Sequence, residues 1–296
     1  EANNLMLSNF SDGEIFISNI EHPSIFSHHK VSKNVKLIKI DSNDITDFED
    51  LRGQLKASKF EKKLVSVMMA NNETGIIQPI KEIAEIAHQY GAVVHSDCVQ
   101  SAGKIDINLL ELGVDFISIS AHKFGGPVGA AVLIGKISIP LKAQIIGGGQ
   151  ERGMRAGTEN IVAIAGFGEA AILAKKELKN RASRMLSLRA KLENGLFDID
   201  PDIEIVGKGA DRLPNTSLII NSKYKAETQL IALDLKGIAI SSGSACSSGK
   251  ISESHVLEAM GYSKEKMASA LRISIGWNTT EQEIEKFLEI YKEINS

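Results

Sequence analysis

Three short stretches in the first third of the chain decide the fold: LVSVMM at residues 64–69, IKEIAEIAHQYG at residues 80–91 and AVVH at residues 92–95. The first and the third are apolar runs typical of buried strands. In the middle stretch the apolar residues recur at helical spacing, and Gly91 ends the helix. A strand, a helix and a strand joined by short turns predict a mostly parallel sheet covered by helices.

Similar apolar runs extend this pattern in both directions along the chain. We predict further strands at residues 15–17 and 35–40, and again at residues 116–120 and 130–134. In sheets of this kind the chemistry collects at the carboxyl ends of the strands. The residues that follow each predicted strand are therefore the first candidates for a functional site.

A long helical pattern from about Ile161 to about Phe197 separates the chain into two parts. We expect this helix to cross from one domain into the next near residue 178. The sequence therefore predicts an α/β protein with a large domain at residues 1–178 and a smaller α/β domain at residues 179–296.

The smaller domain is also expected to contain both strands and helices. Apolar runs at residues 218–220 and 239–240 are typical of strands. The last helix begins with a capping box formed by Thr280 and Glu283, and an apolar face follows it.

Composition and charge exclude several classes of function. The 296 residues include 34 basic and 37 acidic side chains, so no basic field indicates nucleic-acid or membrane-surface binding. The most apolar helical stretch, Ile161–Ala174, is too short to span a membrane and contains Glu169. Two cysteines do not make a disulfide framework, which favours a reducing, cytoplasm-like compartment.

Two strand ends carry residues that suit a covalent cofactor. Lys123 follows the strand at residues 116–120, and a partly desolvated lysine amine can form a Schiff base. Asp97 ends the strand that contains Val94, and a carboxylate there can hold the protonated ring nitrogen of pyridoxal phosphate (PLP). Each alone has an ordinary explanation, a surface lysine in a turn and a helix N-cap. Together, at the ends of two neighbouring strands, they form the pair that a PLP site requires.

Polar residues in nearby loops are candidates for holding the same cofactor. Gln100 lies one turn beyond the aspartate, and Asn72 belongs to the turn NNETG at residues 71–75. His22 follows an early strand, where an imidazole can stack on a ring and move protons, unless it is one loop histidine among seven. The glycine-rich loop at residues 147–158 suits phosphate binding through its N–H groups, with a plain flexible connection as the alternative.

Two residues of the smaller domain are also candidates for a role in the chemistry. Cys246 lies in SSGSACSSG at residues 241–249, a small polar loop, whereas free cysteines are normally buried. An exposed thiol there can act as a nucleophile if its pKa suits. Arg272 lies in a strand-like apolar run, and a buried arginine needs a carboxylate partner from the protein or from a substrate.

In this order the motifs resemble those of the NifS/IscS-type cysteine desulfurases, in the class V branch of the fold-type-I PLP enzymes. The matching segments span the whole chain: EANN, EHPSI, NNETG, HSDCVQS, SAHKFGGP, GGGQERGMRAGT, SSGSAC and LRISIG. The resemblance implies the fold-type-I architecture with a smaller C-terminal domain, and a homodimer. It implies no part for a metal, a membrane or directly bound nucleic acid.

The resemblance also assigns roles to the candidate residues. It implies that Lys123 carries PLP, that His22 stacks on the ring and moves protons, and that Cys246 takes the sulfur of L-cysteine as a persulfide. Arg272 would hold the substrate carboxylate, and L-alanine would leave. The sulfur would pass to an iron–sulfur scaffold or to a sulfur carrier for tRNA thiolation. The remaining cofactor contacts would come from Asp97, Gln100, Asn72, Ser120, His122 and Thr158. Of these, Asn72 would also orient the substrate, and Thr158 would reach the phosphate of the partner subunit.

Two departures from the family pattern leave alternatives open. The Gly-Ala-Thr that precedes the counterpart of Glu1 in the family is not in this sequence, nor is the N-terminal arm before it. A second hypothesis is therefore a truncated homologue that acts at most as a binding partner. Cys98 replaces a small residue without a thiol, and it is either inert or able to form a thiazolidine. A selenocysteine lyase or another class V enzyme is the third hypothesis.

Overall fold

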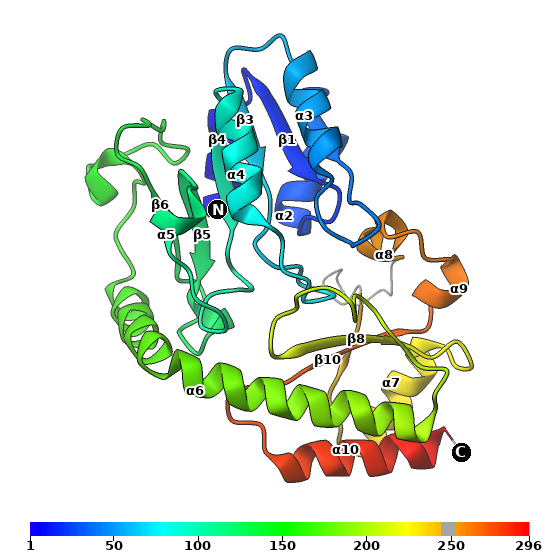
Figure 1. Ribbon diagram of the computed structural model, residues 1–296. Helices are drawn as coiled ribbons and strands as arrows, with labels where there is room; N and C mark the ends of the chain where they lie inside the picture. Colours follow the sequence, from blue (N-terminus) through cyan, green and yellow to red (C-terminus); the bar gives the residue numbers. More distant parts are fainter. Residues whose placement is uncertain (244–252, 296) are drawn as a thin grey trace. The chain divides into compact units, whose positions relative to one another are not determined.

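The computed structural model describes residues 1–243 and 253–295, and the chain divides into two compact units. The first unit comprises Glu1–Ala70 and Gln78–Leu178, and the second comprises Asn71–Ile77 and Lys179–Ser296. The helix α6 (Ile161–Ile199) runs from the first unit into the second, and the division falls within it (Figure 1). The segment Asn71–Ile77 belongs to the second unit, although the sequence-based division assigned it to the larger domain.

The first unit contains a six-stranded sheet in the order β2-β1-β3-β4-β5-β6. All neighbouring strands are parallel except β6, which pairs with β5 in the antiparallel direction. This confirms the mostly parallel sheet predicted from the sequence. The strands are β1 (Glu14–Ser18), β2 (Val35–Ile38), β3 (Lys63–Ser66), β4 (Val93–Asp97), β5 (Phe116–Ser120) and β6 (Ala131–Gly135).

Helices cover both faces of this sheet. Successive side chains of a strand point to opposite faces, and here both sets are apolar and pack against helices. Phe16 and Val65 pack on one face in a cluster with side chains of α3 and α4. Their neighbours Ile15 and Leu64 pack on the other face with Met6 of α1. The helices of this unit are α1 (Ala2–Asn9), α2 (Pro23–Phe26), α3 (Phe48–Ala57), α4 (Ile80–Gln89) and α5 (Leu109–Leu112), with short 3₁₀ turns η1 (Ser27–Lys30), η2 (Ala121–Lys123) and η3 (Gln150–Gly153).

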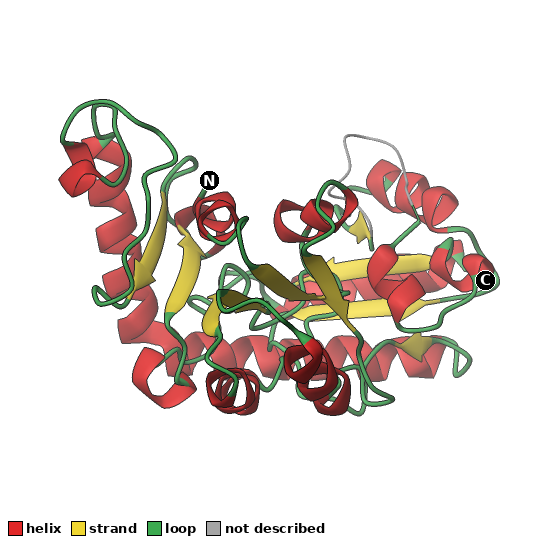
Figure 2. Cartoon of the chain, turned by 90° about the horizontal axis from the view of Figure 1, so that it is seen from above, coloured by secondary structure: helices red, strands yellow, loops and turns green. Residues whose placement is uncertain are grey.

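The second unit is built on an antiparallel sheet in the order β7-β8-β10-β9, with helices beside the strands (Figure 2). Its core joins Leu192 and Leu196 of α6 to Phe287 and Tyr291 of α10. The capping box of Thr280 is present as predicted. The elements are β7 (Glu204–Ile205), β8 (Thr216–Ile220), α7 (Ala226–Leu235), β9 (Ser241–Ser242), α8 (His255–Ala259), α9 (Lys264–Met267), β10 (Ala270–Ser274) and α10 (Glu281–Ile294).

One predicted strand was misplaced. The sequence indicated a strand at residues 239–240, whereas β9 lies at Ser241–Ser242. The pairing explains the difference, because Ser242 and Ser241 are the residues opposite Leu271 and Arg272 of β10. Ile240 instead packs against the apolar core of the second unit.

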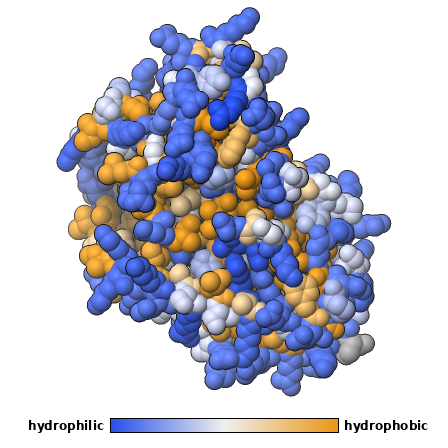
Figure 3. Space-filling view, viewed as in Figure 1, coloured by the Kyte–Doolittle hydropathy of each residue, from blue (hydrophilic) through white to orange (hydrophobic). Residues whose placement is uncertain are grey.

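On the face drawn in Figure 3, hydrophilic side chains predominate and apolar side chains lie among them. In the first unit, five large apolar side chains within residues 128–162 are at least 73% exposed: Val128, Ile137, Ile146, Ile161 and Val162. Large exposed apolar side chains are candidates for an interaction surface where they form a contiguous patch. Within the described ranges, no helix is both long and apolar enough to cross a membrane.

Candidate functional site

Asp97 is a buried carboxylate at the carboxyl end of β4, with 5% of its surface exposed. Its Oδ1 accepts a hydrogen bond from the Val99 amide at 2.9 Å, and its Oδ2 accepts one from Asn3 Nδ2 at 2.7 Å. Both donors are neutral, and no ion pair to Asp97 exists among the described residues. Burial raises the pKa of this carboxyl group. The alternative role as a helix N-cap does not hold, because no helix begins between residues 98 and 108.

A second buried carboxyl group, that of Glu21, is affected by the charge of the first. Its Oε1 accepts hydrogen bonds from Ser18 Oγ at 2.5 Å and from the Met68 amide at 2.8 Å. The pKa of Glu21 is raised to about 8, chiefly by burial and also by the negative charge of Asp97. Two nearby carboxylates resist simultaneous ionisation, and the raised pKa of Glu21 favours its protonated form at neutral pH.

His22 lies directly after Glu21 and is held by the first turn of α2. Its Nδ1 accepts a hydrogen bond from the Ser24 amide at 3.2 Å, which leaves the ring proton on Nε2. Burial lowers the pKa of His22, with opposing effects from Asp97 and Lys123. The imidazole is therefore neutral near pH 7. The three predicted residues His22, Asp97 and Lys123 form one electrostatic cluster in the first unit.

Lys123 ends the 3₁₀ turn η2, which follows β5 directly. The buried Ala121 anchors this turn, since its carbonyl accepts a hydrogen bond from the Gly126 amide at 2.9 Å. A Cβ atom at Gly126 would lie 2.7 Å from the Ala121 Cβ, so the close approach requires glycine. The side chain of Lys123 is exposed, and the partial desolvation expected from the sequence is wrong for the described chain.

The other predicted cofactor residues of the first unit are polar and at least partly exposed. Ser120 Oγ and His122 Nδ1 lie 2.9 Å apart beside the lysine turn. Gln100 Oε1 accepts a hydrogen bond from Lys104 Nζ at 3.2 Å. Thr158 is exposed in the loop that precedes α6.

In the second unit the structure brings Asn72 and Arg272 together. Arg272 lies on β10, and its Nη1 donates a hydrogen bond to the backbone carbonyl of Asn72 at 2.9 Å. Two buried polar atoms, Arg272 Nε and Asn72 Oδ1, have no hydrogen-bond partner among the described residues. The guanidinium is half-buried, and the part of the chain that the structure describes supplies it with no ion-paired carboxylate. It therefore keeps donors for the carboxylate of a ligand.

The two cysteines have different standing. Cys246, the predicted nucleophile, lies outside the described residues. Cys98 is fully buried, with its Sγ 3.8 Å from Met69 Sδ. Burial raises its pKa to about 12, so this thiol stays protonated. Of the two hypotheses for Cys98, an inert thiol and a thiol that forms a thiazolidine, the inert thiol agrees with the structure.

The sequence analysis missed three residues of interest: Asn3, which donates a hydrogen bond to Asp97; Glu21, whose pKa the charge of Asp97 raises; and Glu73, beside Asn72. Each lies within a motif already singled out (EANN, EHPSI and NNETG). The signal available in the sequence was that each is a polar residue within a motif of assigned residues. The motif did not indicate which distant residue each of them contacts.

Comparisons with known proteins agree with these motifs. The family described as Aminotransferase class-V matches residues 1–287. A cysteine desulfurase of Sinorhizobium fredii is 39% identical over 280 residues, which cover 94% of this chain and 72% of that protein. The cysteine desulfurase IscS of Clostridium botulinum is 37% identical over 286 residues, or 95% of this chain and 71% of that protein. The crystal structure of a NifS-like protein from Rickettsia africae is 43% identical with a TM-score of 0.94, over 99% of this chain and 79% of that one. The chain therefore belongs to the class V aminotransferase family, as a member of its NifS/IscS-type cysteine desulfurases.

Proposed function

We propose that this cysteine desulfurase holds PLP on its first unit and removes sulfur from L-cysteine with the help of Arg272 and Cys246. The observation that carries the proposal is the environment of Asp97. A buried carboxylate with two neutral donors lacks a partner of opposite charge, and such a group is costly to bury. The protonated ring nitrogen of PLP would supply that charge, so the residues present fit the cofactor that this family generally uses.

The other residues of the first unit suit the rest of the cofactor. The exposed amine of Lys123 would hold PLP covalently. The Ser120 and His122 side chains would contact its phosphate, Gln100 would meet its ring hydroxyl, and His22 would lie against its ring. When bound, PLP draws electrons from the substrate carbon atoms and so weakens the bond from carbon to sulfur.

A role of His22 in proton transfer is supported by its neutral ring and by the hydrogen bond that its Nδ1 accepts from the Ser24 amide. Nε2 is thus the ring atom that would meet the substrate or the cofactor. A lowered pKa keeps this imidazole uncharged at neutral pH, where it can exchange a proton with little cost.

Arg272 and Asn72 would hold the substrate in the second unit. The Asn72 carbonyl orients the guanidinium, and the remaining donors would bind the carboxylate of cysteine. The Cys246 thiolate would then form a bond to the substrate sulfur while the bond from Cβ to sulfur breaks. The electron pair of the broken bond goes to the carbon, which gains a proton, so that alanine leaves and a persulfide remains.

We also propose a homodimer that passes sulfur to an iron–sulfur scaffold or to a sulfur carrier. The exposed apolar side chains within residues 128–162 support an interface of the first unit. The exposed Thr158 is available to a partner subunit's cofactor phosphate. A cytoplasmic location remains a prediction from the composition.

The test begins with PLP itself. The purified chain is incubated with PLP, its visible absorbance is recorded, and borohydride fixes the adduct for peptide mapping. We expect the label on Lys123 and the release of one alanine for each cysteine consumed. A chain without label would support the hypothesis of a binding partner, and turnover of selenocysteine without turnover of cysteine would support a lyase.

A further inference from the structure

The turn that carries Asn72 and Glu73 is anchored within the second unit. The Asn71 side chain accepts hydrogen bonds from the Glu73 and Thr74 amides at 2.8 and 3.0 Å, which closes the turn. The Gly75 carbonyl accepts a hydrogen bond from the Leu213 amide at 2.8 Å. Gly75 has a φ of 76°, a conformation that favours glycine. The turn thus has a defined shape and a fixed attachment.

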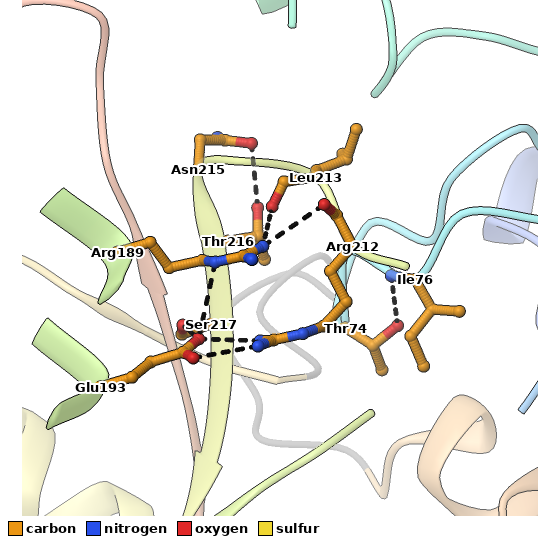
Figure 4. A network of polar contacts seen from close by, with 9 residues as sticks. All are labelled: Thr74, Ile76, Arg189, Glu193, Arg212, Leu213, Asn215, Thr216 and Ser217. Carbon is orange, nitrogen blue, oxygen red and sulfur yellow. Dashed lines mark hydrogen bonds and ion pairs between the residues drawn. The ribbon is translucent and has the colours of Figure 1, made fainter. Parts of the chain in front are cut away.

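A partly buried polar network fixes the strand against which this turn lies (Figure 4). Arg212, which forms an isolated β-bridge with Ile76 of the turn segment, donates to both carboxylate oxygens of Glu193 at 2.8 and 3.0 Å. Ser217 also donates to Glu193, and Arg189 donates to the Leu213 carbonyl. A bidentate pair with these supports restricts movement of the turn.

Glu73 places its carboxyl group inside this unit, with 5% of the residue exposed. Its Oε2 accepts a hydrogen bond from Ser254 Oγ at 2.5 Å. The same Ser254 oxygen caps α8 by accepting a hydrogen bond from the Leu257 amide at 3.1 Å. A Cβ atom built at Gly243 would lie 3.4 Å from the same Oε2 oxygen. The carboxyl group therefore binds Ser254 and lies next to the backbone at Gly243.

The charge that acts on Glu73 comes from Arg272. Among the described residues of the second unit, Arg272 of β10 is the charged group whose electrostatic field acts on Glu73. Ser254, the N-cap of α8, is the residue that donates a hydrogen bond to Glu73. The two side chains do not form an ion pair in the described chain, because Arg272 Nη1 instead donates to the Asn72 carbonyl. The Glu73 carboxyl group thus acts on the proposed carboxylate-binding arginine without forming an ion pair with its guanidinium.

We propose that Glu73 is a positioning residue for Arg272. Glu73 holds the turn beside the Arg272 guanidinium, and the protonation state of Glu73 sets how strongly Arg272 attracts the substrate carboxylate. The inference rests on the proposed role of Arg272. A protonated Glu73 leaves the full positive charge of Arg272 to the substrate. An ionised Glu73 opposes the approach of a second carboxylate.

The balance between these states falls near neutral pH. Burial raises the pKa of Glu73 to about 7, while the Ser254 hydroxyl and the Arg272 charge act in the opposite direction. Substrate affinity should therefore decline as the pH rises through this value. A purely structural role of Glu73 would give no such dependence.

The experiment compares KM and kcat for L-cysteine between pH 6 and pH 9 in the PLP-loaded wild type and in Glu73→Gln. The ratio of the two KM values at each pH cancels the ionisation of cysteine itself. We expect a ratio near one at pH 6 and a wild-type KM roughly fivefold higher than that of the variant at pH 9. Calorimetric binding of L-alanine, which presents the same carboxylate without turnover, should follow the same ratio. A ratio that stays constant with pH would overturn the proposal.

Three further variants complete the test. Glu289→Gln changes an exposed carboxyl group of α10 and should follow the wild type at every pH. Ser254→Ala removes the hydrogen bond that lowers the pKa of Glu73, so the decline in substrate affinity should move to higher pH. This variant carries the test if Glu73→Gln does not fold.

Arg272→Ala separates the proposed substrate role of Arg272 from the proposed positioning role of Glu73. An unchanged affinity in Arg272→Ala contradicts its proposed substrate role, whereas weaker binding with a constant Glu73→Gln ratio contradicts only the role of Glu73.

Discussion

Replacing Glu21 with glutamine should change how the stability of the protein depends on pH. Glu21 is fully buried and accepts two hydrogen bonds at Oε1, from Ser18 and from the Met68 amide. Glutamine retains a carbonyl oxygen for these donors but has no proton to lose. The substitution therefore isolates the titration of this one carboxyl group.

The expected magnitude follows from the pKa of Glu21, which is about 8 in the folded chain against an ordinary value of 4.5. Because the folded-state pKa is raised, the stabilisation is complete below pH 4.5 and is lost as the pH rises through 8. At about 1.4 kcal/mol for each pKa unit, the wild type should lose about 3 to 4 kcal/mol relative to Glu21→Gln between pH 5 and pH 8. That is a large part of the stability of an ordinary domain.

The assay is urea unfolding of both proteins at several pH values, with the difference in free energy of unfolding plotted against pH. Glu85→Gln, an exposed carboxyl group on α4, serves as the control and should give no slope. Parallel curves for the wild type and Glu21→Gln would mean that Glu21 is ionised in the folded protein. The assignment of Glu21 as a protonated carboxyl group at neutral pH would then be wrong.

The remaining predictions concern the cofactor, the sulfur and the backbone. Cys246→Ser should keep PLP and lose sulfide production, and an unchanged sulfide yield would exclude this thiol as the acceptor. Asp97→Asn should weaken PLP binding roughly a hundredfold in an absorbance titration, because the ring nitrogen loses its charged partner. Gly126→Ala should lower the free energy of unfolding by roughly 1–3 kcal/mol, since its Cβ would meet another Cβ at 2.7 Å. Gly168→Ala, in α6 with nothing within 4 Å, should instead raise it by roughly 0.5–1 kcal/mol.

Local patterns were sufficient for the architecture. The alternation that sends Ile15 to one face and Phe16 to the other is a property of neighbouring residues, so it is readable without the partner strands. The helix from Ile161 and the capping box at Thr280 were predictable for the same reason, because a helix and its cap depend on residues three or four positions apart. The ordered motifs also indicated the family that the comparisons then showed.

Where contacts join distant segments, the sequence alone was insufficient. The strand at residues 241–242 is determined by its pairing with β10, and the apolar residues before it indicated the wrong position. The exposure of Lys123 depends on the buried Ala121 turn, which a desolvation argument from the preceding strand could not include.

The sequence by itself therefore determined the elements, their order and the candidate residues, because these follow from local spacing and from motifs. Only the tertiary structure decided the state of those residues. Asn3 meets Asp97 across 94 positions, and Ser254 meets Glu73 across 181. The protonation of Glu21 and Glu73 arises from such burial. A carboxyl group has its ordinary pKa in a sequence, and only the packed chain removes the water that sets it.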